Sequence, residues 1–291
     1  MASLSSPELA AICGRLGIGE IAADLAGLRQ FYRAWCLHVP FDNLRKTNAL
    51  FRDPTRPLPA LDASVFFADW LSDGTGGTCW PHAEALHAVL TALGFDARRA
   101  TARWFDWLPA SHATTLVRLD DGSNWVLDNS LLTLEPLCFD SEAPSMFTDE
   151  LRHSEVEVAG DDIFVHGTHP PFLSSFYRLV ERDASLEHYA DRWEFSRTVS
   201  RLNDRLIILR SWPDRMEALR GTSLYTLDGS GLRLDTLDEG GIRRHLVETM
   251  GISPSFVETW ADSGAMAASL RPSGPLPIPP VRVPPSKRAP S

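Results

Sequence analysis

The hydrophobic period of the chain changes once, at Gly94, and this change limits the folds available to it. Before that glycine, apolar residues recur every three or four positions over residues 6–16, 25–40, 61–72 and 80–93, as on the buried faces of helices. After it, residues 95–104, 113–119 and 124–128 have the composition and period of strands. Helices followed by a sheet predict the α+β class.

The remaining sequence gives a less regular pattern. Residues 135–200 mix short strand candidates with loops. Strands at 204–210, 222–228 and 232–236, with a helix at 242–250, predict a small α/β unit, and eight of the 21 prolines fall in residues 271–291, which predicts an extended tail. We therefore expect four parts, with a helical part at 1–94, a strand-rich part at 95–200, an α/β part at 201–264 and a Pro-rich tail at 265–291.

Composition excludes several classes of protein. A chain of 291 residues with 44% hydrophobic content can bury a large core, which excludes a disordered protein. The formal net charge of −10 would repel nucleic-acid phosphates. No apolar run reaches the ~20 residues of a membrane span, and the N-terminus has neither a basic nor an apolar signal region. We expect a cytoplasmic protein that binds neither nucleic acid nor membrane, with its four cysteines as thiols.

One of the four cysteines stands in a position suited to chemistry. The run Gly-Thr-Gly-Gly at residues 74–77 delivers Cys79 to the start of a helix, where free N–H groups and the helix dipole favour a thiolate. His112, 33 residues later, and Asp128, a further 16 residues on, are candidates for its base and for the acid that orients the base. This arrangement predicts nucleophilic catalysis by Cys79.

The predicted hairpin between residues 113 and 128 brings His112 and Asp128 near each other. If it is symmetric about Asp121 and Gly122, Asp128 lies opposite Thr115 and His112 is offset by three residues. Direct contact then needs a bulge or a loop just before the first strand of the hairpin.

The three other cysteines, and the histidines close to Cys79 in sequence, are expected to have no chemical role. Cys13, Cys36 and Cys138 lie on apolar stretches and are expected to fill core positions. His82 and His87 could join Cys79 in a metal site, but histidines five residues apart diverge on a helix. We predict no metal.

Four motifs together resemble one known family. They are Val-Pro-Phe-Asp-Asn-Leu at 39–44, Gly-Gly-Thr-Cys at 76–79, Leu-Gly-Phe-Asp-Ala-Arg at 93–98, and His112 followed by a hairpin ending in Leu-Asp at 127–128. This pattern is similar to the arylamine N-acetyltransferases over roughly residues 5–255. The resemblance implies an N-terminal helical bundle, a central β-barrel and a C-terminal α/β lid around a papain-like Cys-His-Asp core.

The resemblance also implies a reaction. Cys79 would attack an acyl thioester, form an acyl-enzyme and pass the acyl group to a small aromatic amine in a ping-pong sequence. His112 would move protons and Asp128 would orient its ring. Acetyl-CoA is the default donor, an acyl group on a carrier protein is an alternative, and no cofactor would be bound permanently.

Several positions depart from the family pattern. Where the family usually has Arg, this chain has Thr75 in a strict alignment and Gly76 in a loose one, and Asp42 stands where the family usually has Glu. We therefore expect Asp42 to bond to Thr75 or to backbone instead. Residues 129–132 lack the glycines of the family's donor loop, and Trp80 with Pro81 replaces the usual Phe-Glu. These changes indicate a different donor or acceptor, as in relatives that transfer long acyl chains, including amide synthases that release polyketides.

Other residues are expected to contact substrate. We predict that these are Phe41, Trp80, Trp104, Asn129 and Ser130, with Trp104 in an aromatic cluster just before His112.

Two further functions fit the same residues. The order of Cys79, His112 and Asp128 also suits a transglutaminase-like hydrolase, although the motif at 41–44 argues against it. A catalytically silent relative that only binds a ligand is compatible with the missing arginine and glycines.

Overall fold

The computed structural model describes residues 4–59, 61–104, 110–140, 145–170 and 172–271. The first third of this chain is helical, as its 3–4 spacing predicts. The helices are α1 (Ser6–Leu16), α2 (Leu25–His38), α3 (Leu44–Arg52), α4 (Ala63–Asp73) and α5 (Cys79–Ala92). Local sequence sets their ends: the Asp62 side chain accepts a hydrogen bond from the Val65 N–H, and Gly74 ends α4 at a φ of 75°.

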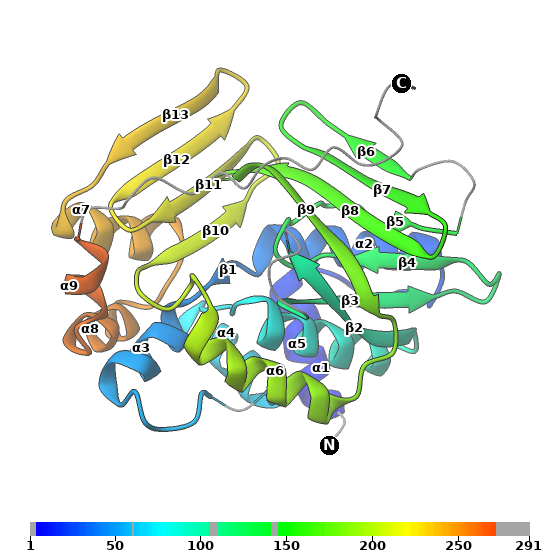
Figure 1. The fold of residues 1–291 in the computed structure, drawn as a ribbon, viewed down its shortest axis with the longest axis horizontal. Helices are drawn as coiled ribbons and strands as arrows, with labels where there is room; N and C mark the ends of the chain where they lie inside the picture. The colour runs from blue at the N-terminus through cyan, green and yellow to red at the C-terminus, as the bar shows by residue number, and fades with distance from the viewer. Residues whose placement is uncertain (1–3, 60, 105–109, 141–144, 171, 272–291) are drawn as a thin grey trace.

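An antiparallel eight-stranded sheet follows the helices and curls into a nearly closed barrel (Figure 1). Its strands, in sequence, are β2 (Asp96–Trp104), β3 (His112–Arg118), β4 (Asn124–Leu127), β5 (Leu137–Cys138), β6 (Met146–Thr148), β7 (His153–Ala159), β8 (Asp162–His169) and β9 (Phe172–Glu181). Their order is β5-β4-β3-β2-β9-β8-β7-β6, and β5 also contacts β7 near the far end. Helix α5 packs on β2 and β3, which joins the helices to the barrel.

A five-stranded sheet forms the lid-like C-terminal part, and helix α6 (Leu186–Val199) leads to it. The order is β1 (Phe41–Asp42), β10 (Ile207–Ser211), β11 (Arg215–Arg220), β12 (Ser223–Asp228) and β13 (Gly231–Thr236). Side chains from this sheet share a hydrophobic core with those of α7 (Glu239–Arg244), a π-helical turn (His245–Thr249), α8 (Pro254–Asp262) and α9 (Ala265–Ser269). Strand β1 comes from the N-terminal part, so the lid is built from both ends of the chain (Figure 1).

The predicted fold class is confirmed: the chain combines helices, a barrel and a C-terminal sheet. Helices α3, α6, α8 and α9 and strands β1 and β11 were not predicted. The division of the chain at residues 94, 200 and 264 stays a prediction, and the Pro-rich tail from residue 272 onward lies outside the described residues.

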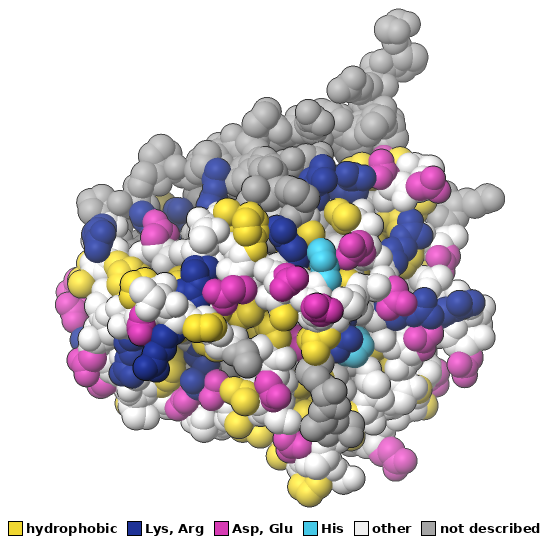
Figure 2. Space-filling model, turned by 60° about the horizontal axis from the view of Figure 1, so that its bottom comes forward, with side chains coloured by type: hydrophobic (Ala, Val, Ile, Leu, Met, Phe, Trp, Pro, Cys, Tyr) yellow, Lys and Arg dark blue, Asp and Glu magenta, His cyan; other side chains and the backbone are white. Residues whose placement is uncertain are grey.

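The surface charges and the hydropathy of the helices bear on how the chain meets its surroundings. Acidic and basic side chains are interspersed over the face shown in Figure 2. None of the helices described is both long enough and apolar enough to cross a bilayer.

Candidate active site

Cys79 is the first residue of α5, and a tightly packed turn places it there. The Gly76 N–H donates to Asp42 Oδ2 at 2.6 Å, and the Asp42 N–H donates to the Gly77 carbonyl at 3.1 Å. A Cβ atom on Gly76 would lie 1.8 Å from the Pro40 carbonyl oxygen, so only glycine allows this approach. The turn before the cysteine is therefore fastened to β1.

The Cys79 side chain is nearly buried, at 9% exposure, beside a histidine and an acid. His112 Nε2 and Asp128 Oδ2 are 2.8 Å apart, and both residues are buried. Because Nε2 bonds to the acid, Nδ1 is left for the thiol, and a hydrogen bond between His112 and Cys79 contributes to the ring's pKa. The structure thus brings Cys79, His112 and Asp128 together, and we call them the thiol cluster.

The hairpin register differs by one residue from the predicted one. Thr115 pairs with Leu127, so Asp128 comes opposite Thr114, two residues from His112. An offset of two keeps both side chains on one face of the sheet, whereas the predicted offset of three does not. The predicted register is wrong, and contact between the two side chains does not need the bulge or loop that this register required.

The turn of the hairpin explains the correction. The predicted register assumes a loop with an even number of residues, centred between Asp121 and Gly122. The loop instead contains three residues, 120–122, and its last residue, Gly122, has a φ of 87°. The Gly122 N–H donates to the Leu119 carbonyl at 2.9 Å, and the Leu119 N–H donates to the Ser123 carbonyl at 2.9 Å.

Hydrogen bonds from the following loop hold the Asp128 carboxylate as an anion. Its Oδ1 accepts from the Ser130 N–H at 2.7 Å and from the Leu131 N–H at 2.5 Å. Burial alone would raise the pKa of Asp128, but the charge of His112, their hydrogen bond and these two N–H groups lower it. Tyr32 donates its hydroxyl to the Asp128 carbonyl, which fixes the backbone as well.

The same environment favours a charged imidazole ring. Burial by itself would lower the pKa of His112, but the Asp128 carboxylate and hydrogen bonds to Asp128 and Cys79 raise it to about 9. An imidazolium beside the sulfur is the counter-ion that a thiolate needs.

Two aromatic rings enclose the imidazole. Its centroid lies 5.0 Å from the Trp104 ring and 4.7 Å from the Tyr177 ring. Trp104 was predicted near the site, whereas Tyr177 comes from β9, in the region whose register the sequence does not indicate.

The other predicted substrate residues lie in varied surroundings. Phe41 is on β1, with its ring 6.5 Å from that of His82. Trp80 is 2% exposed and packs edge-on against Tyr189, 5.1 Å between centroids. Asn129 is fully buried and donates from Nδ2 to the Cys79 carbonyl at 3.4 Å.

Ser130, the last of the predicted substrate residues, is 6% exposed and donates to Asn129 Oδ1 at 3.1 Å. Asn129 thus contacts the Cys79 backbone directly, and Ser130 contacts Asn129. Their substrate contacts stay predictions.

An arginine that the sequence did not indicate supports the turn. Arg45, on α3, donates from Nε to Thr75 Oγ1 at 2.7 Å and from Nη2 to Asp73 Oδ2 at 2.7 Å. The predicted bond from Asp42 to backbone is confirmed, since it accepts from the N–H groups of Gly76 and Leu44. Burial raises the pKa of Asp42 to about 6 despite these bonds. Only the folded chain shows that Arg45, 30 positions before Thr75, reaches it.

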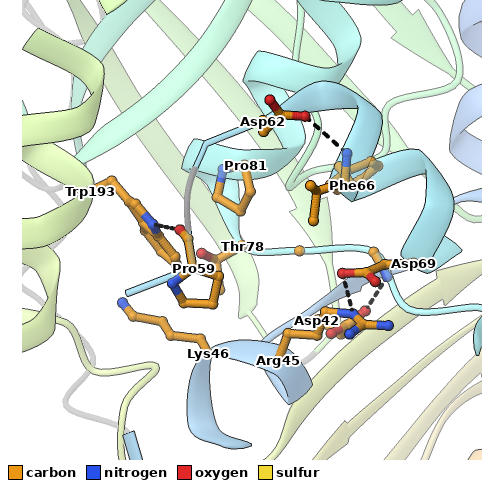
Figure 3. Close-up of a pocket in the computed structure, with 13 residues that line it drawn as sticks. Asp42, Arg45, Lys46, Pro59, Asp62, Phe66, Asp69, Thr78, Pro81 and Trp193 are labelled. Carbon is orange, nitrogen blue, oxygen red and sulfur yellow. Dashed lines mark hydrogen bonds and ion pairs between the residues drawn. The ribbon is translucent and has the colours of Figure 1, made fainter. Parts of the chain in front are cut away.

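A pocket opens next to this turn, on the side of α5 where α3, α4 and α6 meet (Figure 3). Its lining includes Lys46, Phe66, Thr78, Pro81 and Trp193 but none of the three residues of the thiol cluster. Within the described residues, no group of three or more His, Cys, Asp or Glu side chains could hold a metal ion.

Comparison with known proteins identifies the family. A family model described as N-acetyltransferase matches residues 24–257. The chain belongs to the arylamine N-acetyltransferase family. The predicted resemblance is confirmed.

Solved members of the family share the fold. The arylamine N-acetyltransferase of Mycobacterium marinum in complex with CoA has a TM-score of 0.76 at 18% identity, covering 90% of this chain and 98% of that one. The Nocardia farcinica enzyme has a TM-score of 0.74 at 23% identity, covering 89% of this chain and 95% of that one.

A curated relative comes from Amycolatopsis mediterranei, strain S699. Proansamycin X synthase is 26% identical over 152 residues, which is 49% of this chain. The match spans 56% of the length of that relative, so its activity is not carried over by the match alone.

Proposed function

We propose that this N-acetyltransferase family member transfers an acyl group from an acyl thioester to an aromatic amine through an acyl-Cys79 intermediate. The observation that carries the proposal is the buried His112 ring, which bonds to Asp128 through one nitrogen and leaves the other for the thiol. A thiol with an oriented, charged imidazole beside it is the arrangement that covalent acyl transfer requires.

In the first half-reaction the Cys79 thiolate attacks the thioester carbonyl. The new bond joins Cys79 Sγ to the acyl carbon, the bond from that carbon to the donor sulfur breaks, and His112 gives its proton to the departing thiolate. Asp128 keeps the ring oriented throughout.

In the second half-reaction the amine replaces the cysteine. The neutral His112 ring accepts a proton as the amine nitrogen attacks the acyl carbon, the amide forms, and the carbon–sulfur bond to Cys79 breaks. The imidazolium and thiolate are restored. The product amide is more stable than the thioester, so the reaction is favourable in this direction.

Acetyl-CoA is the proposed donor. The M. marinum relative with the same fold has been solved in complex with CoA, which supports a CoA thioester here. No permanently bound cofactor takes part, and the amine acceptor follows from the family.

A second candidate is an amide synthase that takes a long or polyketide acyl chain from a carrier protein. The match to Proansamycin X synthase supports it. So does the sequence Asn-Ser-Leu-Leu at 129–132, which replaces glycine with bulkier residues directly after Asp128.

Intact-protein mass spectrometry tests both candidates. The protein is mixed with acetyl-CoA, malonyl-CoA or a long-chain acyl-CoA, and the acyl group that remains bound identifies the donor. Cys79→Ala should remain unmodified, whereas Cys13→Ala should be acylated like the unmodified sequence, because Cys13 lies on α1. Acylation of the Cys79→Ala protein would contradict the proposal.

Two further measurements separate the remaining alternatives. A silent ligand-binding relative would react with iodoacetamide at Cys79 no faster than free cysteine does, and the proposed enzyme would react much faster near neutral pH. A transglutaminase-like hydrolase would release free acid from the acyl-enzyme whether or not an aromatic amine is added.

A further inference from the structure

The hydroxyl of Thr78 is buried without a partner. Thr78 is the N-cap residue of α5 and is 2% exposed, and its Oγ1 makes no hydrogen bond among the described residues. An N-cap oxygen usually accepts from the N–H three residues on, but that residue is Pro81, which has none. The proline therefore leaves the hydroxyl available to a ligand.

A buried ammonium group lines the same pocket. Lys46 is 4% exposed; its Nζ donates to Ser196 Oγ at 2.7 Å and lies 4.8 Å from the centroid of the Trp193 ring. No carboxylate of the described chain forms a salt bridge with Lys46. Among the acidic groups that act on its charge, the Cys79 thiol ranks above Glu194. Glu194 lies on the same helix as Ser196 and is itself paired with Arg197.

The charges at the other end of the pocket are compensated. Arg45 forms salt bridges with Asp69 at 2.9 Å and with Asp73 at 2.7 Å. Among the described residues, Lys46 is thus the basic side chain of the pocket that forms no salt bridge. It lies at the same end of the pocket as Thr78, where the positive end of the α5 dipole also favours an anion (Figure 3).

The rest of the lining is largely apolar. The side chains on this wall are Pro59, Val65, Phe66, Pro81 and Trp193. Three carboxylates, Asp42, Asp62 and Asp69, also line the pocket, and their negative charges oppose a ligand with two or more negative charges most strongly.

We propose that this pocket binds a small monocarboxylate with an apolar body, such as an aryl carboxylate. The carboxylate would accept hydrogen bonds from Lys46 Nζ and Thr78 Oγ1, and the ring would lie against Trp193 and Pro81. None of the three residues of the thiol cluster lines this pocket, although the Cys79 sulfur is close enough to act on the charge of Lys46. Carboxylate binding here goes beyond the proposed acyl transfer and does not require it.

The lysine content of the chain allows a direct test. Lys46 and Lys287 are its only lysines, so a sample with ¹³C-labelled lysine gives two side-chain signals, which Lys287→Arg assigns. Burial lowers the pKa of Lys46 to about 8. Benzoate should move the Lys46 signal saturably and raise its titration midpoint, because a bound anion favours the ammonium form. The Lys287 signal should not respond.

Variants on one helix provide a matched control. Thr78→Val removes the free hydroxyl and should weaken benzoate binding about five- to tenfold. Thr91→Val removes a hydroxyl near the other end of α5 and should leave binding unchanged. Cys79→Ala should bind benzoate at least as tightly as the unmodified protein, because the sulfur that acts on Lys46 would repel a carboxylate. Retained binding without the thiol separates this site from the proposed reaction.

Three results would overturn the proposal. The Lys46 signal could fail to respond to benzoate, it could respond equally to neutral benzamide, or inorganic phosphate could displace benzoate at similar concentrations. The second result would indicate a purely apolar pocket, and the third an unselective anion site.

Discussion

The Asp128 carboxylate contributes more to the charge on His112 than Cys79 does. In Asp128→Asn, the neutral amide can no longer favour the imidazolium, so the pKa of His112 should fall from about 9 toward its ordinary range. Acyl transfer should fall on the order of 10²–10⁴-fold. Histidine NMR measures the first effect and amide formation the second; an unchanged His112 titration would contradict the assignment.

The same pair makes stability depend on pH. Folding raises the pKa of His112 to about 9, so the folded protein binds this proton more tightly than the unfolded chain. The stabilisation, roughly 3 kcal/mol, is complete below the unfolded pKa of about 6.5 and is lost as pH rises through 9. The free energy of unfolding in urea should fall more between about pH 7 and about pH 10 for the unmodified protein than for His112→Gln. An equal fall in both proteins would show that His112 is not the source of the pH dependence.

The Thr75 side chain lies against the guanidinium of Arg45. Thr75→Arg would bury a second guanidinium beside Arg45, which already bonds to the Thr75 hydroxyl, and should lower the free energy of unfolding by on the order of 3 kcal/mol. The exchange Thr75→Arg with Arg45→Thr restores a single cation and should recover part of this loss. A higher melting temperature for Thr75→Arg alone would show that the turn has room for both cations.

At the scale of elements, the turn before α5 depends on close backbone contact. Gly76→Ala would force a Cβ against the Pro40 carbonyl and separate the turn from β1, which should cost about 2–4 kcal/mol. Gly14→Ala, in α1 with nothing within 4 Å of the added carbon, should instead gain up to about 1 kcal/mol. Urea unfolding of both variants checks this, and equal stability would mean that the turn adapts.

Local signals predict elements whose ends are determined by their own residues. The ends of α4 follow from Asp62 and Gly74, and a glycine-led turn places Cys79 at a helix start. Helix α6 was missed because its buried side chains, Tyr189, Trp193 and Ser196, form a narrow stripe among charged residues.

Tertiary contacts explain the parts of the site that the sequence did not predict. The thiol, imidazole and acid were predicted from motif and order, but the contacts of Arg45 with Thr75 and of Tyr177 with His112 join segments distant in sequence. The one-residue register difference came from a three-residue loop that closes on Gly122.

At the scale of the whole molecule, one asparagine fastens the C-terminal sheet to the helices. Asn43 donates from Nδ2 to the carbonyls of Leu202 and Arg205 and accepts from the Ile207 N–H at 2.9 Å. Asn43→Ala should cost about 2–4 kcal/mol and should speed hydrogen exchange in β10.

Asn48→Ala is the matched control, since Asn48 lies on α3 and its Oδ1 has no hydrogen-bond partner among the described residues. In Asn48→Ala, the β10 amides should exchange hydrogen at the same rate as in the unmodified protein. Unchanged exchange in Asn43→Ala would show that the sheet is held elsewhere.

Strand β1 is two residues long, yet its backbone bonds to β10 along one edge and to Gly77 along the other. A shortened chain that ends before residue 207 would lose the neighbour on one edge, and the glycine turn carrying the sulfur would rest on a ribbon with nothing behind it. The last third of the protein thus supports the turn that carries Cys79, and we expect a chain shortened in this way to lose the proposed acyl transfer.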